Sequence, residues 1–286
     1  MKIKKVGVLG AGTMGSGIAQ LYAQSGFEVV LKDVSDELVQ RGLKNIDRNL
    51  SRLVSKAKLS ENDKTAVLSR LKGTVEMADL ADVDYVIEAA FEDMELKKRL
   101  FKELDELTKP EVILSTNTST LSITDIASVT KRPENVVGMH FFNPPPVMKL
   151  VEIVKGYLTS DETISTARDL AEKLGKETVL AKKDTPGFIV NRAFIPHLIE
   201  AMKMYEEGVA SIEDIDKAIK LGLNYPMGPF ELMDLLGNDN SLDVFSSLER
   251  ELGKEFTFDV PYSLKATVKA GKLGRKTGEG WYKYKK

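Results

Sequence analysis

The chain has 286 residues, of which 42% are apolar and 29% are charged, and its formal net charge at neutral pH is -2. This length exceeds what one hydrophobic core organises efficiently, so we expect two domains. The small net charge gives no attraction to nucleic acid or to an anionic membrane, the apolar runs are too short to cross a bilayer, and the absence of cysteine excludes disulfides and thiol catalysis.

The first predicted elements are a strand, a glycine-rich turn and a helix. Lys5 to Leu9 is a short β-branched and apolar run, followed by Gly10-Ala11-Gly12-Thr13-Met14-Gly15 and by the helix-like run Ser16 to Ala23. A second predicted strand, Glu28 to Lys32, ends at Asp33. A GxGxxG between a strand and a helix, with an acid about 20 residues further on, is the dinucleotide-binding fingerprint. We therefore predict a Rossmann-type domain that binds NAD.

Each part of this fingerprint has a physical task. Gly10 permits the tight turn, Gly12 lets the backbone approach the pyrophosphate, and Gly15 allows the helix to pack closely on the strand. The helix N-terminus offers unpaired N–H groups to the phosphates. Asp33 can accept hydrogen bonds from the ribose hydroxyls and would repel a 2′-phosphate, which favours NAD over NADP, although the preceding Lys32 weakens this preference.

The α/β pattern continues to about residue 181. Further helices are predicted from Ser35 to roughly Ala57, from Glu61 to about Leu71, from Glu95 to Leu107 and from Ser160 to Leu174. Further strands are predicted at Tyr85 to Glu88, Val112 to Leu114, Val136 to Phe141, Leu150 to Val154 and Thr178 to Ala181. The polar loop Ser115 to Thr120 follows one of these strands, where open α/β sheets bind ligands. The alternative, which the residues alone leave equally open, is an N-cap cluster for the helix after Ser122.

One of only two histidines in the chain, His140, stands at the end of an apolar run. Glu152 lies inside the next apolar run, and Pro144 to Pro146 force a turn between the two. A carboxylate beside a histidine fixes its tautomer and stabilises its imidazolium, as a general base at neutral pH requires. The alternative is a hydrogen-bonded core histidine and an edge glutamate.

After Ala181 the residue pattern changes. A charged segment with Pro186 and Gly187 is predicted to be a hinge, and the patterns that follow predict helices. We predict domains at residues 1–183 and 184–286, the second all-helical. Its helices are expected at Ile189 to Glu207, with Pro196 as a kink or interruption, and then from Ser211 to Gly222, from Pro229 to Gly237 and from Leu242 to Leu252. The second histidine, His197, lies in the first of these and is interpreted as structural.

The motifs GAGTMG, STNTST, MHFFNPPPVMKLVE, DTPGFIVNR, NYPMGPFEL and KTGEGWY occur in this order. Together they resemble the 3-hydroxyacyl-CoA dehydrogenase family over essentially the whole chain, in particular its bacterial short-chain 3-hydroxybutyryl-CoA members. The resemblance implies an oxidoreductase that interconverts (S)-3-hydroxyacyl-CoA and 3-ketoacyl-CoA, for example acetoacetyl-CoA, with NAD. It also implies a helical domain that mediates homodimerisation.

The resemblance assigns roles to individual residues. His140 and Glu152 match the catalytic pair, while Ser119 and Asn191 match positions that hold the substrate. Positions near NAD are matched by Ser119 again and by Asp33, Glu92, Lys97, Asn143 and Lys276. Lys56 matches a position that contacts the CoA moiety, and Lys58 could share that work.

Several alternatives stay open on the residues alone. Lys56 and Lys58 could be a solvated helix face, and Glu92 with Lys97 could be a plain ion pair at a helix start. The whole chain could act on a hydroxy acid that carries no CoA, or be a non-catalytic NADH-binding or structural protein. We expect a cytoplasmic protein without a targeting peptide, and no metal, nucleic-acid or membrane partner.

Overall fold

The structure, a computed structural model, describes residues 3–252 and 259–284. The chain divides into two compact units, Met1–Thr185 and Pro186–Lys286. The first is an α/β unit and the second is helical, so the predicted fold class is confirmed. The sequence places the boundary after residue 183, and the division by contacts lies after Thr185.

The first unit is built on one sheet of eight strands in the order β3-β2-β1-β4-β5-β6-β7-β8. Strands β1 to β6 are mutually parallel, β7 is antiparallel to β6, and β8 is parallel to β7. The strands are β1 (Lys5–Leu9), β2 (Glu28–Lys32), β3 (Leu71–Thr74), β4 (Tyr85–Glu88), β5 (Ile113–Thr116), β6 (Val136–Phe141), β7 (Leu150–Val154) and β8 (Glu177–Ala181).

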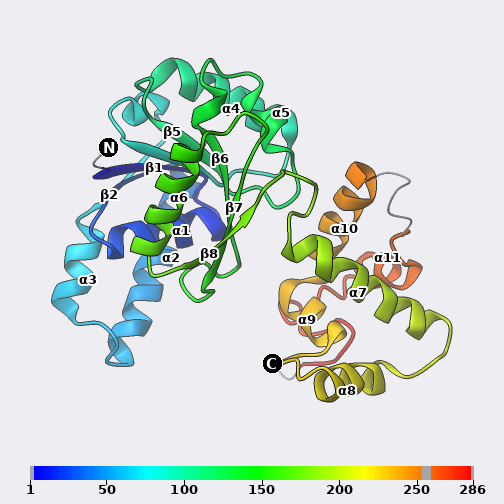
Figure 1. Cartoon of the computed structure of the whole chain (residues 1–286). Coiled ribbons are helices and arrows are strands. Elements are labelled where there is room, and N and C mark those ends of the chain that lie inside the picture. Colours follow the sequence, from blue (N-terminus) through cyan, green and yellow to red (C-terminus); the bar gives the residue numbers. More distant parts are fainter. Residues whose placement is uncertain (1–2, 253–258, 285–286) are drawn as a thin grey trace. The chain divides into compact units, whose positions relative to one another are not determined.

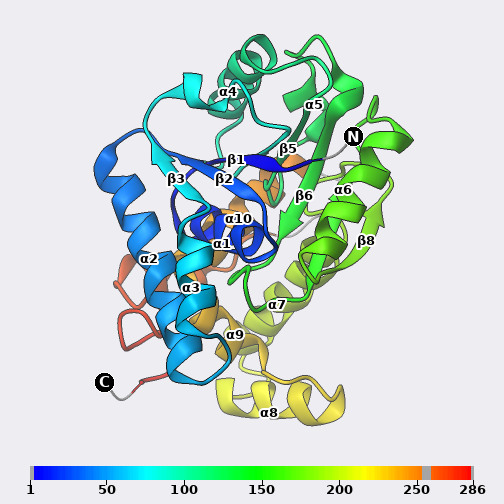
Figure 2. The same ribbon diagram turned by 90° about the vertical axis from the view of Figure 1, so that its left-hand side faces the viewer.

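Helices cover both faces of this sheet (Figures 1 and 2). One face packs against α1 (Thr13–Gln24), α2 (Asp36–Ser55) and α6 (Asp161–Lys173) in a single apolar core. The other face carries α4 (Met94–Leu107) and α5 (Ile123–Ala127). Because side chains alternate along a strand, Met139 and Phe141 enter the first core while Gly138 and His140 face the side of α5.

Serine and aspartate side chains set most helix starts of the first unit. Ser35, Ser60, Asp93, Ser122 and Ser160 are N-caps, each accepting a hydrogen bond from a backbone N–H three residues later. Two helices of this stretch end earlier than their predicted approximate ends. Helix α3 (Glu61–Leu68) ends before Leu71, which instead begins β3, and α2 ends at Ser55, so that Lys56 is its C-cap rather than a helical residue.

The helical unit contains α7 (Val190–Glu206), α8 (Ile212–Gly222), α9 (Pro229–Leu236), α10 (Asn238–Leu252) and α11 (Tyr262–Lys269). Helix α7 runs through Pro196 without a break, contrary to one of the expected outcomes. Helix α10 starts four residues earlier than predicted, and α11 was not predicted. Apolar side chains from α7 to α11, among them Met202, Phe230 and Leu248, form the core of this unit.

Two buried carboxylates organise the helical unit. Asp216 on α8 accepts hydrogen bonds from the backbone N–H groups of Phe230 and Glu231, and so caps α9 in place of Gly228, which has no side chain. Asp234 accepts from the backbone N–H groups of Trp281 and Tyr282, which anchors the C-terminal turn. The glycines of the NYPMGPFEL and KTGEGWY motifs fit these contacts, since a Cβ on Gly228 would meet the Asp216 carboxyl group at 2.3 Å.

Candidate active site

The polar groups of the first unit converge on one edge of its sheet. Strands β1, β2, β4, β5 and β6 are parallel, and their carboxyl ends carry Gly10, Asp33, Glu88, Asn117 and His140 at or next to the last residue. This is the edge at which open α/β sheets bind ligands. The edge therefore combines a dinucleotide turn with titratable side chains.

The glycine turn has the shape that a dinucleotide requires. Gly10 has a φ of +97°, and a Cβ on Gly15 would lie 1.8 Å from the Gly10 carbonyl oxygen, so neither position accepts a side chain. A Cβ on Gly12 would meet nothing within 4 Å, which leaves its backbone open to a ligand. Helix α1 starts at Thr13 and no side chain caps it, so its N–H groups and its dipole are available to phosphate oxygens.

Asp33 is fixed at the end of β2. Its Oδ2 accepts a hydrogen bond from the Ala11 backbone N–H at 2.6 Å, and its Oδ1 accepts from the Val34 N–H at 2.6 Å. The carboxylate is thus tied to the glycine turn while the residue stays partly exposed. Each oxygen retains acceptor capacity for ribose hydroxyls, so the residues present fit NAD.

His140 and Glu152 are directly opposite each other on the antiparallel strands β6 and β7. Their side chains point to the same face, and His140 Nδ1 lies 2.7 Å from Glu152 Oε2. His140 is 5% exposed and Glu152 is fully buried. The Phe142 ring packs against the imidazole at a centroid distance of 4.6 Å. A buried carboxylate on Nδ1 fixes the tautomer with the proton on Nδ1, which leaves Nε2 as the basic nitrogen of the ring.

The loop after β5 is held by Glu92. Glu92 Oε1 accepts hydrogen bonds from the Thr118 hydroxyl and from the backbone N–H groups of Ser119 at 2.8 Å and Thr120 at 3.2 Å. Desolvation alone would raise the pKa of the Glu92 carboxyl, but the Lys97 charge and these hydrogen bonds outweigh it and hold the pKa below its usual value. No protein group of the described residues hydrogen-bonds the Ser119 hydroxyl, so it can meet a ligand.

Lys97 is buried rather than exposed at this edge. It is 1% exposed, and its Nζ lies 2.7 Å and 2.9 Å from the two oxygens of Glu88 and 3.4 Å from Glu92 Oε2. Burial alone would lower the pKa of the Lys97 ammonium. The charges and hydrogen bonds of the two carboxylates raise it by more, so the pKa lies above its ordinary value. The ion pair with Glu92 that the sequence suggested is present, with Glu88 as an unforeseen second partner.

Helix α5 is capped by Ser122, which follows the polar loop and accepts a hydrogen bond from the Asp125 backbone N–H at 3.1 Å. The Ser122 hydroxyl donates to Asp184 Oδ2 at 2.7 Å, and the Thr124 backbone N–H donates to the same oxygen at 2.6 Å. Asp184, at which the sequence places the start of the helical domain, makes these contacts within the first unit. No serine or threonine of the loop Ser115 to Thr120 is the N-cap of this helix.

Other predicted positions are exposed. Asn143 precedes a cis peptide bond to Pro144 and is solvent-exposed. Lys56 and Lys58, at the end of α2, are exposed and make no ion pair within the part of the chain that the structure describes. Such ammonium groups are open to a phosphate partner, and equally compatible with a solvated surface.

Asn191 and Lys276 belong to the helical unit. Asn191 lies in the first turn of α7, and Lys276 Nζ is 2.6 Å from the Asp239 carboxylate, with half of its side chain exposed. Desolvation raises the pKa of the Asp239 carboxyl, but the hydrogen bond from Lys276 and its charge lower it more, to below the ordinary value. His197 packs beside the rings of Phe194 and Tyr225, in keeping with a structural role.

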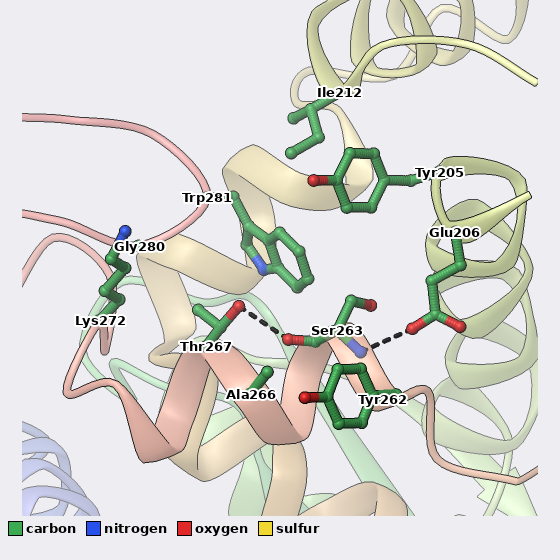
Figure 3. A pocket seen from close by; sticks show the side chains of 10 residues that line it. All are labelled: Tyr205, Glu206, Ile212, Tyr262, Ser263, Ala266, Thr267, Lys272, Gly280 and Trp281. Carbon is green, nitrogen blue, oxygen red and sulfur yellow. Dashed lines mark hydrogen bonds between the residues drawn. The ribbon is translucent and has the colours of Figure 1, made fainter. Parts of the chain in front are cut away.

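A pocket of about 620 Å³ also lies in the helical unit (Figure 3). Tyr205 and Trp281 form one wall, with their rings nearly perpendicular and 6.1 Å apart. On another side the Ser263 backbone N–H donates to Glu206 at 2.6 Å. None of the predicted site residues lines this pocket.

Comparison with known proteins decides the family. Residues 5–185 match the model of the 3-hydroxyacyl-CoA dehydrogenase NAD-binding domain, and residues 187–284 match that of the C-terminal domain of the same family. The chain belongs to the 3-hydroxyacyl-CoA dehydrogenase family. The predicted family membership, NAD-dependent oxidoreductase class and NAD cofactor are therefore confirmed.

Relatives in this family match the chain along its full length. It is 48% identical to a 3-hydroxybutyryl-CoA dehydrogenase of Clostridioides difficile, covering 99% of this chain and 100% of the relative. It is 48% identical to a probable 3-hydroxybutyryl-CoA dehydrogenase of Deinococcus radiodurans, covering 98% and 100%. The crystal structure of (S)-3-hydroxybutyryl-CoA dehydrogenase from Ralstonia eutropha superimposes with a TM-score of 0.93 at 45% identity, covering all of both chains.

Sequence reasoning missed two residues of this edge. Glu88 was interpreted only as the end of a buried strand, although it is a fully buried carboxylate with a lysine partner. Asn117 was given no role of its own within the polar loop. Its Oδ1 accepts a hydrogen bond from the Phe141 backbone N–H at 2.9 Å, next to His140. A carboxylate in an otherwise apolar strand is the one signal that could have singled out Glu88.

Two further properties concern partners. No helix among residues 3–252 and 259–284 is both long and apolar enough to span a bilayer. Within the same described ranges, no group of three or more histidine, aspartate or glutamate side chains is arranged to hold a metal ion.

Proposed function

We propose that the chain catalyses the reversible NAD-linked oxidation of (S)-3-hydroxybutyryl-CoA, and of short (S)-3-hydroxyacyl-CoA thioesters generally, to the 3-ketoacyl-CoA. The observation that carries this proposal is the buried His140–Glu152 pair at the carboxyl edge of a sheet whose first turn is built for NAD. The names of full-length relatives at 48% identity support the CoA thioester as substrate.

In this proposal His140 is the general base. With Nδ1 held by Glu152, the imidazole takes the substrate hydroxyl proton at Nε2. Glu152 stabilises the imidazolium that results, as the carboxylate of a catalytic triad does. NAD, which the glycine turn and Asp33 would hold, would supply the acceptor for the hydride from C3 of the substrate. In the reverse direction the same imidazolium returns its proton to the oxygen of the ketone.

Orientation of the reacting carbon is assigned to two further side chains. The Ser119 hydroxyl has no protein partner among the described residues and would donate to the substrate oxygen. Asn191 is assigned to the substrate carbonyl on the strength of its DTPGFIVNR motif. Asp33 is assigned to the adenine ribose, with Glu92, Lys97, Asn143 and Lys276 near the cofactor and Lys56 near CoA.

Turnover of acetoacetyl-CoA, followed by NADH absorbance, tests the proposal directly. We expect turnover with NADH, much weaker turnover with NADPH because Asp33 repels a 2′-phosphate, and none with free acetoacetate. Equal rates with free acetoacetate would favour the enzyme of a CoA-free hydroxy acid. Absence of turnover with every ketone, alongside intact NADH binding, would favour a non-catalytic NADH-binding protein.

We also propose a homodimer formed through the helical unit, and a cytoplasmic location. The support is the apolar surface of that unit, where Leu221, Leu223, Leu235 and Tyr225 are each 40% or more exposed. Light scattering coupled to size exclusion should give twice the chain mass. A monomer at micromolar concentration would contradict this proposal, and Leu221→Lys tests whether that residue lies in the interface.

A further inference from the structure

Three charged side chains form a continuous chain at the active-site edge. Glu88, fully buried at the end of β4, holds Lys97 Nζ with both oxygens at 2.7 Å and 2.9 Å. Lys97 Nζ in turn lies 3.4 Å from Oε2 of Glu92. Glu88 and Lys97 are buried, whereas 36% of the Glu92 side chain is exposed, so the chain of charges runs from a buried ion pair to an exposed carboxylate.

Such a cluster is a poor way to add stability. Removing a carboxylate and an ammonium from water is costly, and apolar side chains of the same size often stabilise a fold as well or better. A buried charged group is expected to be matched by precise hydrogen bonding, and Glu88 meets this condition. Its Oε1 also accepts from the Ala90 backbone N–H at 2.6 Å, and its Oε2 accepts from the Thr116 hydroxyl at 2.6 Å.

Two series of hydrogen bonds connect the Glu88 carboxylate to the loop after β5, one through Lys97 and one through Thr116. The first continues from Lys97 to Glu92, whose Oε1 accepts from the Thr118 hydroxyl and from the Ser119 backbone N–H. The second continues from the Thr116 hydroxyl to the Thr118 backbone N–H, which donates to that hydroxyl at 3.2 Å. Both series of hydrogen bonds end at Thr118 and Ser119. The position of the Ser119 hydroxyl therefore depends on the Glu88 carboxylate.

We propose that Glu88 is a positioning residue for the reaction, which sets the Ser119 hydroxyl through Lys97, Glu92 and Thr116. This inference rests on the proposed function, in which Ser119 orients the reacting oxygen. Glu88 itself is fully buried and acts only through these neighbours. It has no counterpart among the residues that the family resemblance assigns.

Glu88→Gln is the first test. Both carboxylate oxygens only accept, so the NH₂ group of glutamine must face a donor and one route to the loop is broken. A displacement of Ser119 by a fraction of an ångström should lower kcat by about 10- to 100-fold. The KM for NADH should change by less than about twofold, because Asp33 and the glycine turn are untouched.

A double-mutant cycle with Ser119→Ala separates positioning from general damage. If Glu88 acts through Ser119, then Glu88→Gln should reduce kcat no further than about twofold once the hydroxyl is absent. Independent losses that multiply in the double variant would overturn the inference while leaving the proposed function intact. Should Ser119→Ala alone turn over normally, the role of Ser119 in the proposed function fails and the inference fails with it.

Two further variants keep the test sharp. Asp105→Asn is the matched control, because Asp105 is a buried carboxylate of the same unit, 3.1 Å from Arg132 Nε and near the far end of α4. It should lower the melting temperature and leave kcat unchanged. If Glu88→Gln fails to fold, Thr118→Val breaks the contact to Glu92 at the other end of the chain, and should show the same loss of kcat that disappears in the Ser119→Ala background.

Discussion

Replacing Glu152 with glutamine removes a negative charge from the site while keeping the shape of the side chain. The carboxylate is fully buried and lies 2.7 Å from His140 Nδ1, so water cannot substitute for it. Glutamine can still accept a hydrogen bond from Nδ1–H, but it cannot stabilise the imidazolium by charge. The expected loss is therefore mainly electrostatic and should appear in kcat.

The magnitude follows from the distance. Two unit charges about 4 Å apart, as their centres are in such a pair, interact by about 4 kcal/mol at an effective dielectric constant of about 20. Because each 1.36 kcal/mol corresponds to a factor of about ten in rate, complete loss of this interaction lowers kcat by about 10³-fold. Partial compensation by the amide dipole makes a loss of about 10²-fold the lower bound that we expect.

The assay is steady-state oxidation of NADH by acetoacetyl-CoA, with NADH binding measured separately by fluorescence. The dissociation constant of NADH should stay within about twofold of the original, because Asp33 and the glycine turn belong to other strands. His140→Gln is the companion variant, and its loss should be at least as large. A Glu152→Gln enzyme that retains more than about a hundredth of kcat would refute the electrostatic role of Glu152.

Three other outcomes can be measured. Asp33→Ala should raise the KM for NADH and, because the Ala11 N–H loses its acceptor, destabilise the fold by about 1 kcal/mol in denaturant titrations. Gly15→Ala should abolish NADH binding in a fluorescence titration, since its Cβ would lie 1.8 Å from a carbonyl oxygen, and normal binding would contradict the geometry of the turn. The pKa of the Glu92 carboxyl is lowered on folding, so its stabilisation is present above the pKa of an unfolded glutamate and lost as the pH falls through the lower folded value. The melting temperatures of the original chain and of Glu92→Gln should thus differ at pH 7 and converge below about pH 4, and a gap that stays constant with pH would argue against this.

The parts of the fold that are specified locally could be predicted from the sequence. The glycine turn, the strands on either side of it and Asp33 follow from residue types within a short window, because backbone sterics and hydrogen bonding dictate them there. Serine N-caps of the later helices were readable for the same reason. Strand β3 was not, since Leu71 to Thr74 is a short edge strand with a glycine inside it, paired only with β2.

The candidate site depended on register, which the sequence does not display. His140 and Glu152 were both identified, but only the pairing of β6 with β7 places them directly opposite each other. Lys97 was assigned one carboxylate partner and has two, because the second, Glu88, comes from a strand nine residues earlier. Asn191 and Lys276 were assigned as site residues through the family's motifs alone, since the residues next to them in the sequence do not indicate a role.

Asp184 has a consequence for attempts to recombine this protein with its relatives. Its carboxylate is bound by Ser122 and Thr124, immediately after the loop that carries Ser119, although it stands only two residues before the helical unit begins. A chimera joined after Thr185 would inherit this contact from a single parent. A chimera joined after residue 183 would take the carboxylate from one parent and its donors from the other. The choice of junction between residues 183 and 185 therefore decides whether the contact beside the Ser119 loop is kept.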